Sequence, residues 1–214
     1  MQTIDLAPFL FLKNIYNVGM HYIVGLGNPG EEYKISRHNT GWIMVDGFRK
    51  FEKFGEFEKD KKLNALVSEG KIKKEKIMLI LPETFMNKSG NSIKSLVKSK
   101  KAAESLIVIH DDLDIPLGKI KISFGKNSGG HRGVESIMRA IKTKDFIRIR
   151  VGISPATSKG KIKKPEGKKV IDHILHNFKP AELEILKKNS KKIVSALETI
   201  IIEGLEKAMS LYNG

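Results

Sequence analysis

Apolar residues recur along the chain in two spacings, and each spacing predicts a different kind of element. Short runs that are continuously apolar, or that alternate with polar residues, predict β-strands. They occupy residues 22–26, 63–72, 75–82, 105–114, 119–125 and 146–154. A short lysine-rich turn joins the second run to the third, which predicts a β-hairpin.

Four other segments repeat apolar residues every three or four positions and therefore predict helices. These segments are residues 41–57, 89–99, 133–142 and 180–209. Ser89 opens the second segment as a residue suited to a helix start, and Pro180 stands at the start of the fourth. The last segment predicts a single long C-terminal helix.

The irregular alternation of strands and helices predicts an α/β fold. We expect one domain over residues 20–214, built on a mixed, mostly parallel, twisted sheet sandwiched between helices as three α/β/α layers. Residues 1–19 lack a basic segment before their apolar stretch, so they do not resemble a secretory signal, and we expect them to lie outside the fold. A basic loop is expected near residues 156–169, with six lysines between residues 158 and 169.

Composition narrows the class of protein. The chain has 214 residues, 40% of them apolar, and contains no apolar run long enough to span a membrane. It has no cysteine, which excludes disulfides, a thiol nucleophile and cysteine-bound zinc. A net charge of +15 favours a polyanionic partner such as nucleic acid, although a lysine-rich surface also serves solubility alone.

The motif "GLGNPG" follows the first predicted strand and matches the G-x-G-x-x-G pattern of dinucleotide-binding loops. Such a loop needs a helix to begin at once, so that the helix N-terminus meets the pyrophosphate. Here Pro29 removes an amide donor, and the turn-rich segment "SRHNTG" follows. Asp46, at the spacing of the ribose-binding acid, falls inside a predicted helix instead of at a strand end. The loop is therefore interpreted as a strand exit that presents side chains.

Polar residues follow several of the predicted strands. Asn28, Asn87 and Asp111 each come after an apolar run, and the carboxyl ends of parallel strands meet at one edge of a sheet. His38 lies in the polar loop after the first strand and is favoured as a general base, because a histidine oriented by a carboxylate commonly serves that role. Asparagine amides stabilise an oxyanion without titrating. The set favours direct attack of water on an activated carbonyl.

Neighbouring residues allow other interpretations. His110 lies in a buried strand run and is expected to be structural, and His131 lies among glycines as a turn residue. Asp112 and Asp114 either cap a turn before Pro116 or supply oxygen ligands for magnesium or manganese.

Four blocks of sequence together resemble a known family. They are "VGLGNPGEEYKISRHNTGWIMVD", "PETFMNKSGNSI", "VIHDDLDIPLGKIKISFGKNSGGHRGVESI" and "FIRIRVGIS". In this order, over about residues 21–154, they are similar to successive signatures of the bacterial-type peptidyl-tRNA hydrolase family. The resemblance implies hydrolysis of the ester between a peptide and the 3′-ribose of tRNA. It also implies a cytoplasmic monomer that needs no cofactor and no metal.

The resemblance also assigns roles to residues. It implies that His38 is the catalytic base, that Asp111 orients it, that Asn28 contacts the peptide beside the ester, and that Asn87 holds substrate and water. The further substrate-binding residues that it implies are Tyr33, which lies near the tRNA 3′ end, and Phe85 and Met86, which line the site.

One position departs from the family pattern. Arg132 stands where the family usually has an asparagine, and arginine is longer, always charged and only donates hydrogen bonds. It is expected to contact the substrate, either by gripping a phosphate or the terminal adenosine or by narrowing the peptide subsite. Arg150 matches a position that approaches the 5′-phosphate end of tRNA, with Lys119 and Lys121 nearby. The Arg132 change also leaves open a catalytically inactive RNA-binding relative of the same fold.

Overall fold

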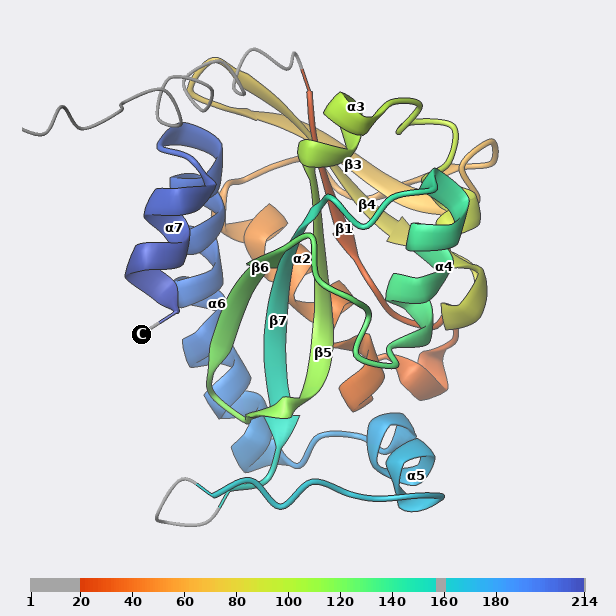
Figure 1. Cartoon of the computed structure of the whole chain (residues 1–214), viewed down its shortest axis with the longest axis vertical. Coiled ribbons are helices and arrows are strands. Elements are labelled where there is room, and N and C mark those ends of the chain that lie inside the picture. The colour runs from red at the N-terminus through yellow and green to blue at the C-terminus, as the bar shows by residue number, and fades with distance from the viewer. Residues whose placement is uncertain (1–19, 157–160, 214) are drawn as a thin grey trace, which may run out of the picture.

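The computed structural model describes residues 20–156 and 161–213, and within them seven strands form one central sheet (Figure 1). The strands are β1 (His21–Gly25), β2 (Glu58–Asp60), β3 (Ala65–Ile72), β4 (Glu75–Pro82), β5 (Leu106–Pro116), β6 (Ile120–Phe124) and β7 (Ile147–Ser154). Their order is β2-β3-β4-β1-β5-β7-β6. The expected extension at residues 1–19 and part of the basic loop, residues 157–160, lie outside the described residues.

Strand direction places the polar segments at one edge of the sheet. β4, β1, β5 and β7 run parallel to one another, whereas β2, β3 and β6 run antiparallel to their neighbours. The predicted hairpin is confirmed, since Ala65 of β3 pairs with Pro82 of β4. Because the four central strands share a direction, their carboxyl ends lie together.

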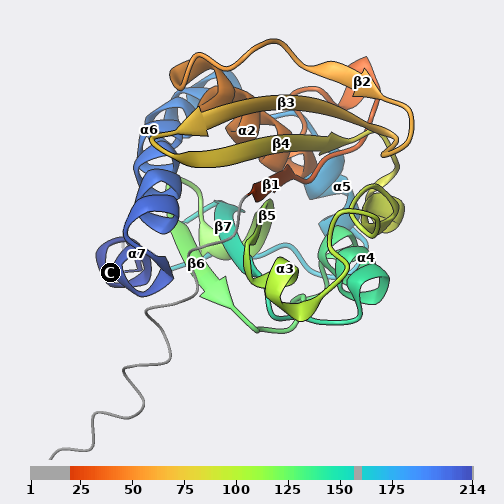
Figure 2. The ribbon, with the colours of Figure 1, turned by 90° about the horizontal axis from the view of Figure 1, so that it is seen from above.

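Helices cover both faces of the sheet (Figure 2). The first layer holds α2 (Thr40–Phe51), α6 (Pro180–Ile202) and α7 (Leu205–Tyr212), and the second holds η3 (Met86–Ser92), α3 (Lys100–Glu104) and α4 (Arg132–Ile141). Alternate residues of β5 serve both layers, because Ile107 and Ile109 join the first core and Leu106 and Val108 the second. The predicted three-layer α/β/α fold is confirmed. No described helix is long and apolar enough to cross a membrane.

The predicted C-terminal helix over residues 180–209 is wrong in its continuity. It begins at Pro180, as expected, but two helices occupy the segment, with Gly204 between them at a φ of +104° that favours glycine. The break directs α7 to β6, where the Asn213 side chain donates to the Ile122 carbonyl and accepts from its amide, at 2.9 and 2.6 Å.

Two other helix predictions also need correction. The helix predicted over residues 41–57 ends at Phe51, and the helix predicted to open at Ser89 is instead the 3₁₀ helix η3. η3 packs tightly on α4, because a Cβ on Gly90 would lie 2.2 Å from the Ser136 carbonyl oxygen. The sequence pattern also does not predict α5 (Lys169–Leu175), which follows the lysine-rich stretch.

Candidate active site

The loop that follows β1 returns to the sheet at unusually close range. Two 3₁₀ helices, η1 (Glu31–Tyr33) and η2 (Arg37–Asn39), connect it to α2. A Cβ on Gly41 would lie 2.3 Å from both the Ile109 carbonyl oxygen and the Leu26 amide nitrogen. Only glycine therefore allows α2 to begin this close to β1 and β5, and the approach brings His38 to the edge of the sheet.

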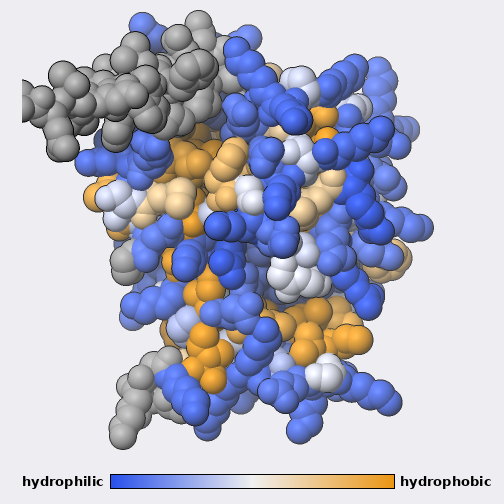
Figure 3. Space-filling view, in the orientation of Figure 1, coloured by the Kyte–Doolittle hydropathy of each residue, from blue (hydrophilic) through white to orange (hydrophobic). Residues whose placement is uncertain are grey.

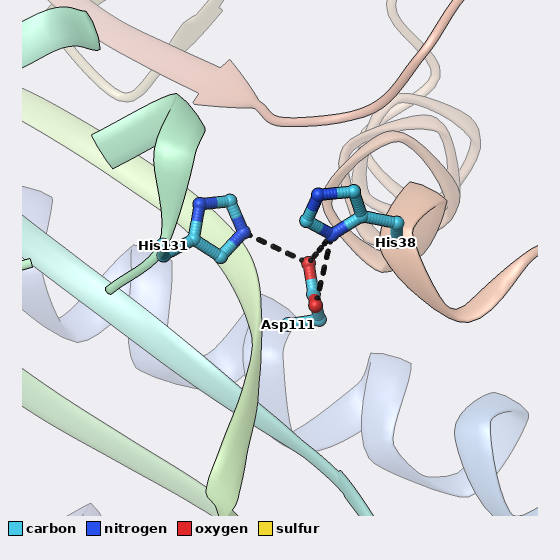
Figure 4. A group of neighbouring side chains, drawn as sticks. All are labelled: His38, Asp111 and His131. Carbon is cyan, nitrogen blue, oxygen red and sulfur yellow. Dashed lines mark hydrogen bonds and ion pairs between the residues drawn. The ribbon is translucent and has the colours of Figure 1, made fainter. Parts of the chain in front are cut away.

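His38 meets the carboxylate of Asp111 at that edge (Figure 4). Its Nδ1 lies 2.9 Å from Oδ1 and 3.0 Å from Oδ2, and both side chains are buried. Because a carboxylate only accepts, Nδ1 carries the hydrogen and donates it. The lone pair of His38 is therefore on Nε2, which points away from Asp111 (Figure 4).

His131 is a second histidine on the same carboxylate, and the sequence interpretation of it as a turn residue missed this contact. Its Nε2 lies 3.0 Å from Oδ1 of Asp111. Its Nδ1 accepts from the amides of Gly133 and Val134 as the N-cap of α4, so the hydrogen is on Nε2. The available signal was its place two residues before the helix predicted over residues 133–142, close to where cap residues stand.

The surroundings of Asp111 set its charge. Burial alone raises the pKa of its carboxyl group, but His38 and His131 outweigh burial and hold that pKa well below its usual range. Asp111 is therefore a carboxylate at neutral pH. His110 is fully buried, as its strand run predicts, and this burial keeps its pKa well below the ordinary value. Neutral His110 donates from Nδ1 to the Asp111 carbonyl at 2.7 Å.

Asn28 is oriented by three hydrogen bonds. The Asn39 side chain accepts from the backbone amide of Asn28 and donates to the backbone carbonyl of Asn28, both at 2.9 Å. The backbone amide of Met86 donates to the side-chain oxygen of Asn28, also at 2.9 Å. With that oxygen engaged, the group that Asn28 offers to a ligand is its Nδ2 donor.

These side chains line a cleft of about 610 Å³. The predicted site residues that line it are Asn28, His38, Phe85, Met86, Asn87, Asp111 and Arg132. Asn87 and Arg132 are exposed to solvent. His131 also lines the cleft and is partly buried. One wall is apolar, because α5 contributes Val170, Ile171, Ile174 and Leu175. Figure 3 shows hydrophobic side chains gathered beside α5.

Comparison with known proteins shows the family and the fold of this chain. A protein-family model described as "Peptidyl-tRNA hydrolase" matches residues 22–214. The chain belongs to the peptidyl-tRNA hydrolase family. It is 41% identical over 197 residues to the peptidyl-tRNA hydrolase of Thermodesulfovibrio yellowstonii, covering 91% of this chain and 99% of the relative. It is 40% identical over 196 residues to that of a Thermoanaerobacter species, covering 91% and 100%.

Solved structures agree with these relatives. The crystal structure of peptidyl-tRNA hydrolase from Acinetobacter baumannii has a TM-score of 0.80 at 30% identity, over 92% of this chain and 95% of that chain. The resemblance drawn from the four sequence blocks is thus confirmed, and the family match extends past them to the C-terminal helices. The relatives are hydrolases, and the comparisons give no support to the inactive RNA-binding alternative.

Four residues predicted to bind substrate do not line the hydrolase cleft. They are Tyr33, Lys119, Lys121 and Arg150. Tyr33 lies in η1, and Lys121 pairs in register with Arg150 across β6 and β7. Arg150 donates from Nε to Asp112 at 2.7 Å. This ion pair connects the basic residues of β6 and β7 to the end of β5 beside the cleft.

Asp112 and Asp114 of "HDDLD" do not join a group that could hold a metal within the described residues. Asp112 binds Arg150, and Asp114 pairs with Lys164, so each carboxylate already has a cation. The group that could hold a metal is His38, Asp111 and His131, whose ligand atoms lie within 4.8 Å of one another. Both histidine nitrogens that face Asp111 carry hydrogens, and a metal would have to displace them.

Proposed function

We propose that this chain hydrolyses the ester between the peptide and the 3′-ribose of peptidyl-tRNA, with His38 as general base and without a metal. The observation that supports this most directly is the pairing of His38 Nδ1 with both oxygens of Asp111, which leaves Nε2 as the acceptor in a cleft. An ester is already activated relative to an amide, so water can attack it without a protein nucleophile.

The proton moves through His38 in this scheme. Water gives its proton to Nε2 as its oxygen bonds to the ester carbonyl carbon, and the Asp111 carboxylate stabilises the resulting imidazolium. The C–O bond to the ribose then breaks, and the imidazolium returns the proton to the 3′-oxygen. General-base help of this kind is typically worth about 10²–10⁴-fold, and positioning with oriented amide dipoles supplies much of the remainder.

Asn28 is proposed to select N-blocked substrates. Its side-chain oxygen is held by Met86, so the group left for the substrate is a donor. A donor suits the carbonyl of a peptide bond or an acetyl group next to the ester. It offers nothing to the free ammonium of an ordinary aminoacyl-tRNA. Asn87, exposed in η3 next to Met86, is proposed to hold substrate and the attacking water.

The tRNA is proposed to lie across the basic residues outside the cleft. Arg150 and Lys121 are neighbours on β7 and β6, and Lys119 precedes β6. Arg132 stands at the cleft itself as the first residue of α4. Contacts of these cations with phosphates would be salt-sensitive and independent of base sequence. We further propose that the protein acts as a monomer in the cytoplasm on the acceptor stem, CCA end and peptide.

The decisive test is hydrolysis of N-acetyl-aminoacyl-tRNA in EDTA, run beside unblocked aminoacyl-tRNA and a His38→Ala variant. We expect rapid release from the blocked substrate only, and its loss in the variant. Loss of activity on adding EDTA, with recovery on adding a divalent metal, would contradict the metal-free mechanism. Binding of tRNA without any release would contradict the enzymatic assignment and favour the RNA-binding alternative.

A further inference from the structure

Arg37, the residue before the proposed base, is buried although it carries a permanent charge. Its side chain is 8% exposed, and its guanidinium points away from Asp111 toward the segment that follows α5. Nη1 donates to three backbone carbonyls, those of His173, His176 and Asn177, at 3.4, 3.2 and 3.1 Å. Nη2 donates to Glu182 Oε2 at 2.8 Å. One side chain thus binds the end of α5 and the first turn of α6.

The backbone reinforces this junction. The Arg37 amide donates to the His176 carbonyl at 3.1 Å, and the Phe178 amide donates to the Ile35 carbonyl at 2.9 Å. The guanidinium also lies over the Phe178 ring, 5.3 Å from its centroid. The segment that carries His38 and the segment that ends α5 are therefore joined directly. Figure 1 shows α5 at one end of the molecule, next to the orange segment that contains η1 and η2.

α5 has little stability of its own. It spans seven residues, none of them buried, and its N-cap residue Lys168 makes no side-chain cap hydrogen bond. Isolated helices this short are marginal in water. Its C-terminal carbonyls carry partial negative charge, which a buried cation satisfies. Besides the Arg37 contacts, His173 donates from Nε2 to the Ile153 carbonyl at 3.1 Å, and Ile174 packs against the first core.

We infer that Arg37 is a positioning residue, which fixes α5 as the apolar wall of the cleft at a set distance from His38. The inference rests on the proposed function, because it concerns the wall against which the acyl part of peptidyl-tRNA would lie. Arg37 has no contact with Asp111 and does not line the cleft. Its loss should therefore loosen binding and leave proton transfer largely intact.

The experiment compares Arg37→Met with Arg49→Met. Arg49 is the matched control, because it is also buried, binds Asp46 and Glu56, and lies over an aromatic ring at 5.5 Å. Arg49 lies about 14 Å along the axis of α2 from the first residue of that helix, Thr40, and it does not line the cleft. Hydrogen exchange of the α5 amides is measured for both variants, together with kcat, KM and the pH profile of kcat/KM. Glu182→Gln serves as a milder variant that keeps the carbonyl contacts.

For Arg37→Met we expect exchange in α5 to rise while the central strands stay protected. We also expect KM to rise about tenfold with kcat changed less than about threefold and the shape of the pH profile unchanged. Glu182→Gln should move KM and α5 exchange the same way by a smaller factor, and Arg49→Met should move neither. Equal effects in the Arg37 and Arg49 variants, or unchanged α5 exchange in Arg37→Met, would overturn the inference. Hydrogen exchange needs no substrate. If the wild-type protein proved inactive, the proposed function would be refuted, and the exchange of the α5 amides would still decide whether Arg37 holds α5.

Discussion

Nε2 of His131 donates to Oδ1 of Asp111 across 3.0 Å, while the other nitrogen of the same ring caps α4. The start of a helix is thereby tied to the carboxylate that holds His38. Asp111 receives one N–H from each side, so two independent elements fix its orientation. This double restraint gives His131 a role that a cap residue alone would not have.

His131→Asn separates the two roles. Asparagine is a good cap residue, but its side chain is too short to reach Asp111. A hydrogen bond to a charged group is worth about 1.5–3 kcal/mol, so we expect kcat to fall at least about tenfold. Thermal unfolding should change little, because the cap of α4 is kept. His131→Ala is the control that loses both contacts and should also lower Tm. An unchanged kcat in His131→Asn would show that the contact of His131 with Asp111 does not contribute to the reaction.

His38→Ala should abolish the proposed chemistry and spare binding. We expect kcat to fall by about 10²–10⁴-fold, because the general base is gone. tRNA affinity should stay nearly unchanged, since the basic residues on β6 and β7 are untouched. Single-turnover hydrolysis and filter binding measure the two effects. Near-normal turnover would place the base elsewhere, and His131 would be examined next.

Arg150→Ala should weaken tRNA binding without altering the base. We expect KM to rise and the slope of log KM against log salt to shrink by about one, as for loss of a single phosphate contact. Removing Arg150 also leaves Asp112 without its ion-pair partner, which adds repulsion toward tRNA. Lys187→Ala is the control, because Lys187 is an exposed cation on α6 that does not line the cleft. An equal dependence of KM on salt in both variants would show that Arg150 does not contact tRNA.

Stability should fall in mild acid because of His110. Burial lowers the pKa of His110 below its unfolded value, so the unfolded chain binds the proton first as pH falls. The stability that neutral His110 contributes is therefore fully present above the unfolded pKa of about 6.5 and is lost progressively as pH falls below it. His21 and His173 also have lowered pKa values and act in the same direction.

His110→Asn keeps an N–H donor and removes the titrating ring, so the free energy of unfolding of this variant should fall less than that of wild type between pH 7.5 and pH 5. Urea unfolding at pH 5 and pH 7.5 measures the difference. An identical pH dependence in wild type and variant would show that His110 is accessible to protons in the folded protein.

The sequence predicted six of the seven strands, all but the short β2, because their signal is local. β4 lies at the predicted residues 75–82, and the four proposed catalytic residues line one cleft as the shared strand direction implied. The failures depend on contacts between distant segments. The 3₁₀ helix η3 replaces a predicted helix where Gly90 contacts α4. His131, at the start of α4, contacts the Asp111 carboxylate on β5. α5 carries apolar residues at helical spacing, Val170, Ile171, Ile174 and Leu175, but its seven residues are too few for periodicity alone to predict a helix after a lysine-rich loop.

The close approach at Gly41 has a consequence for motion. It seats the start of α2 against β1 and β5, so His38 should share the small amplitude of the central sheet. His38 and Asp111, the proposed base and its partner, should therefore keep a fixed position relative to the sheet on the timescale of loop motion. Entry and release of substrate must be accommodated by the other side of the cleft, where α5 and the exposed Gly129–Gly130 turn contribute no buried residue.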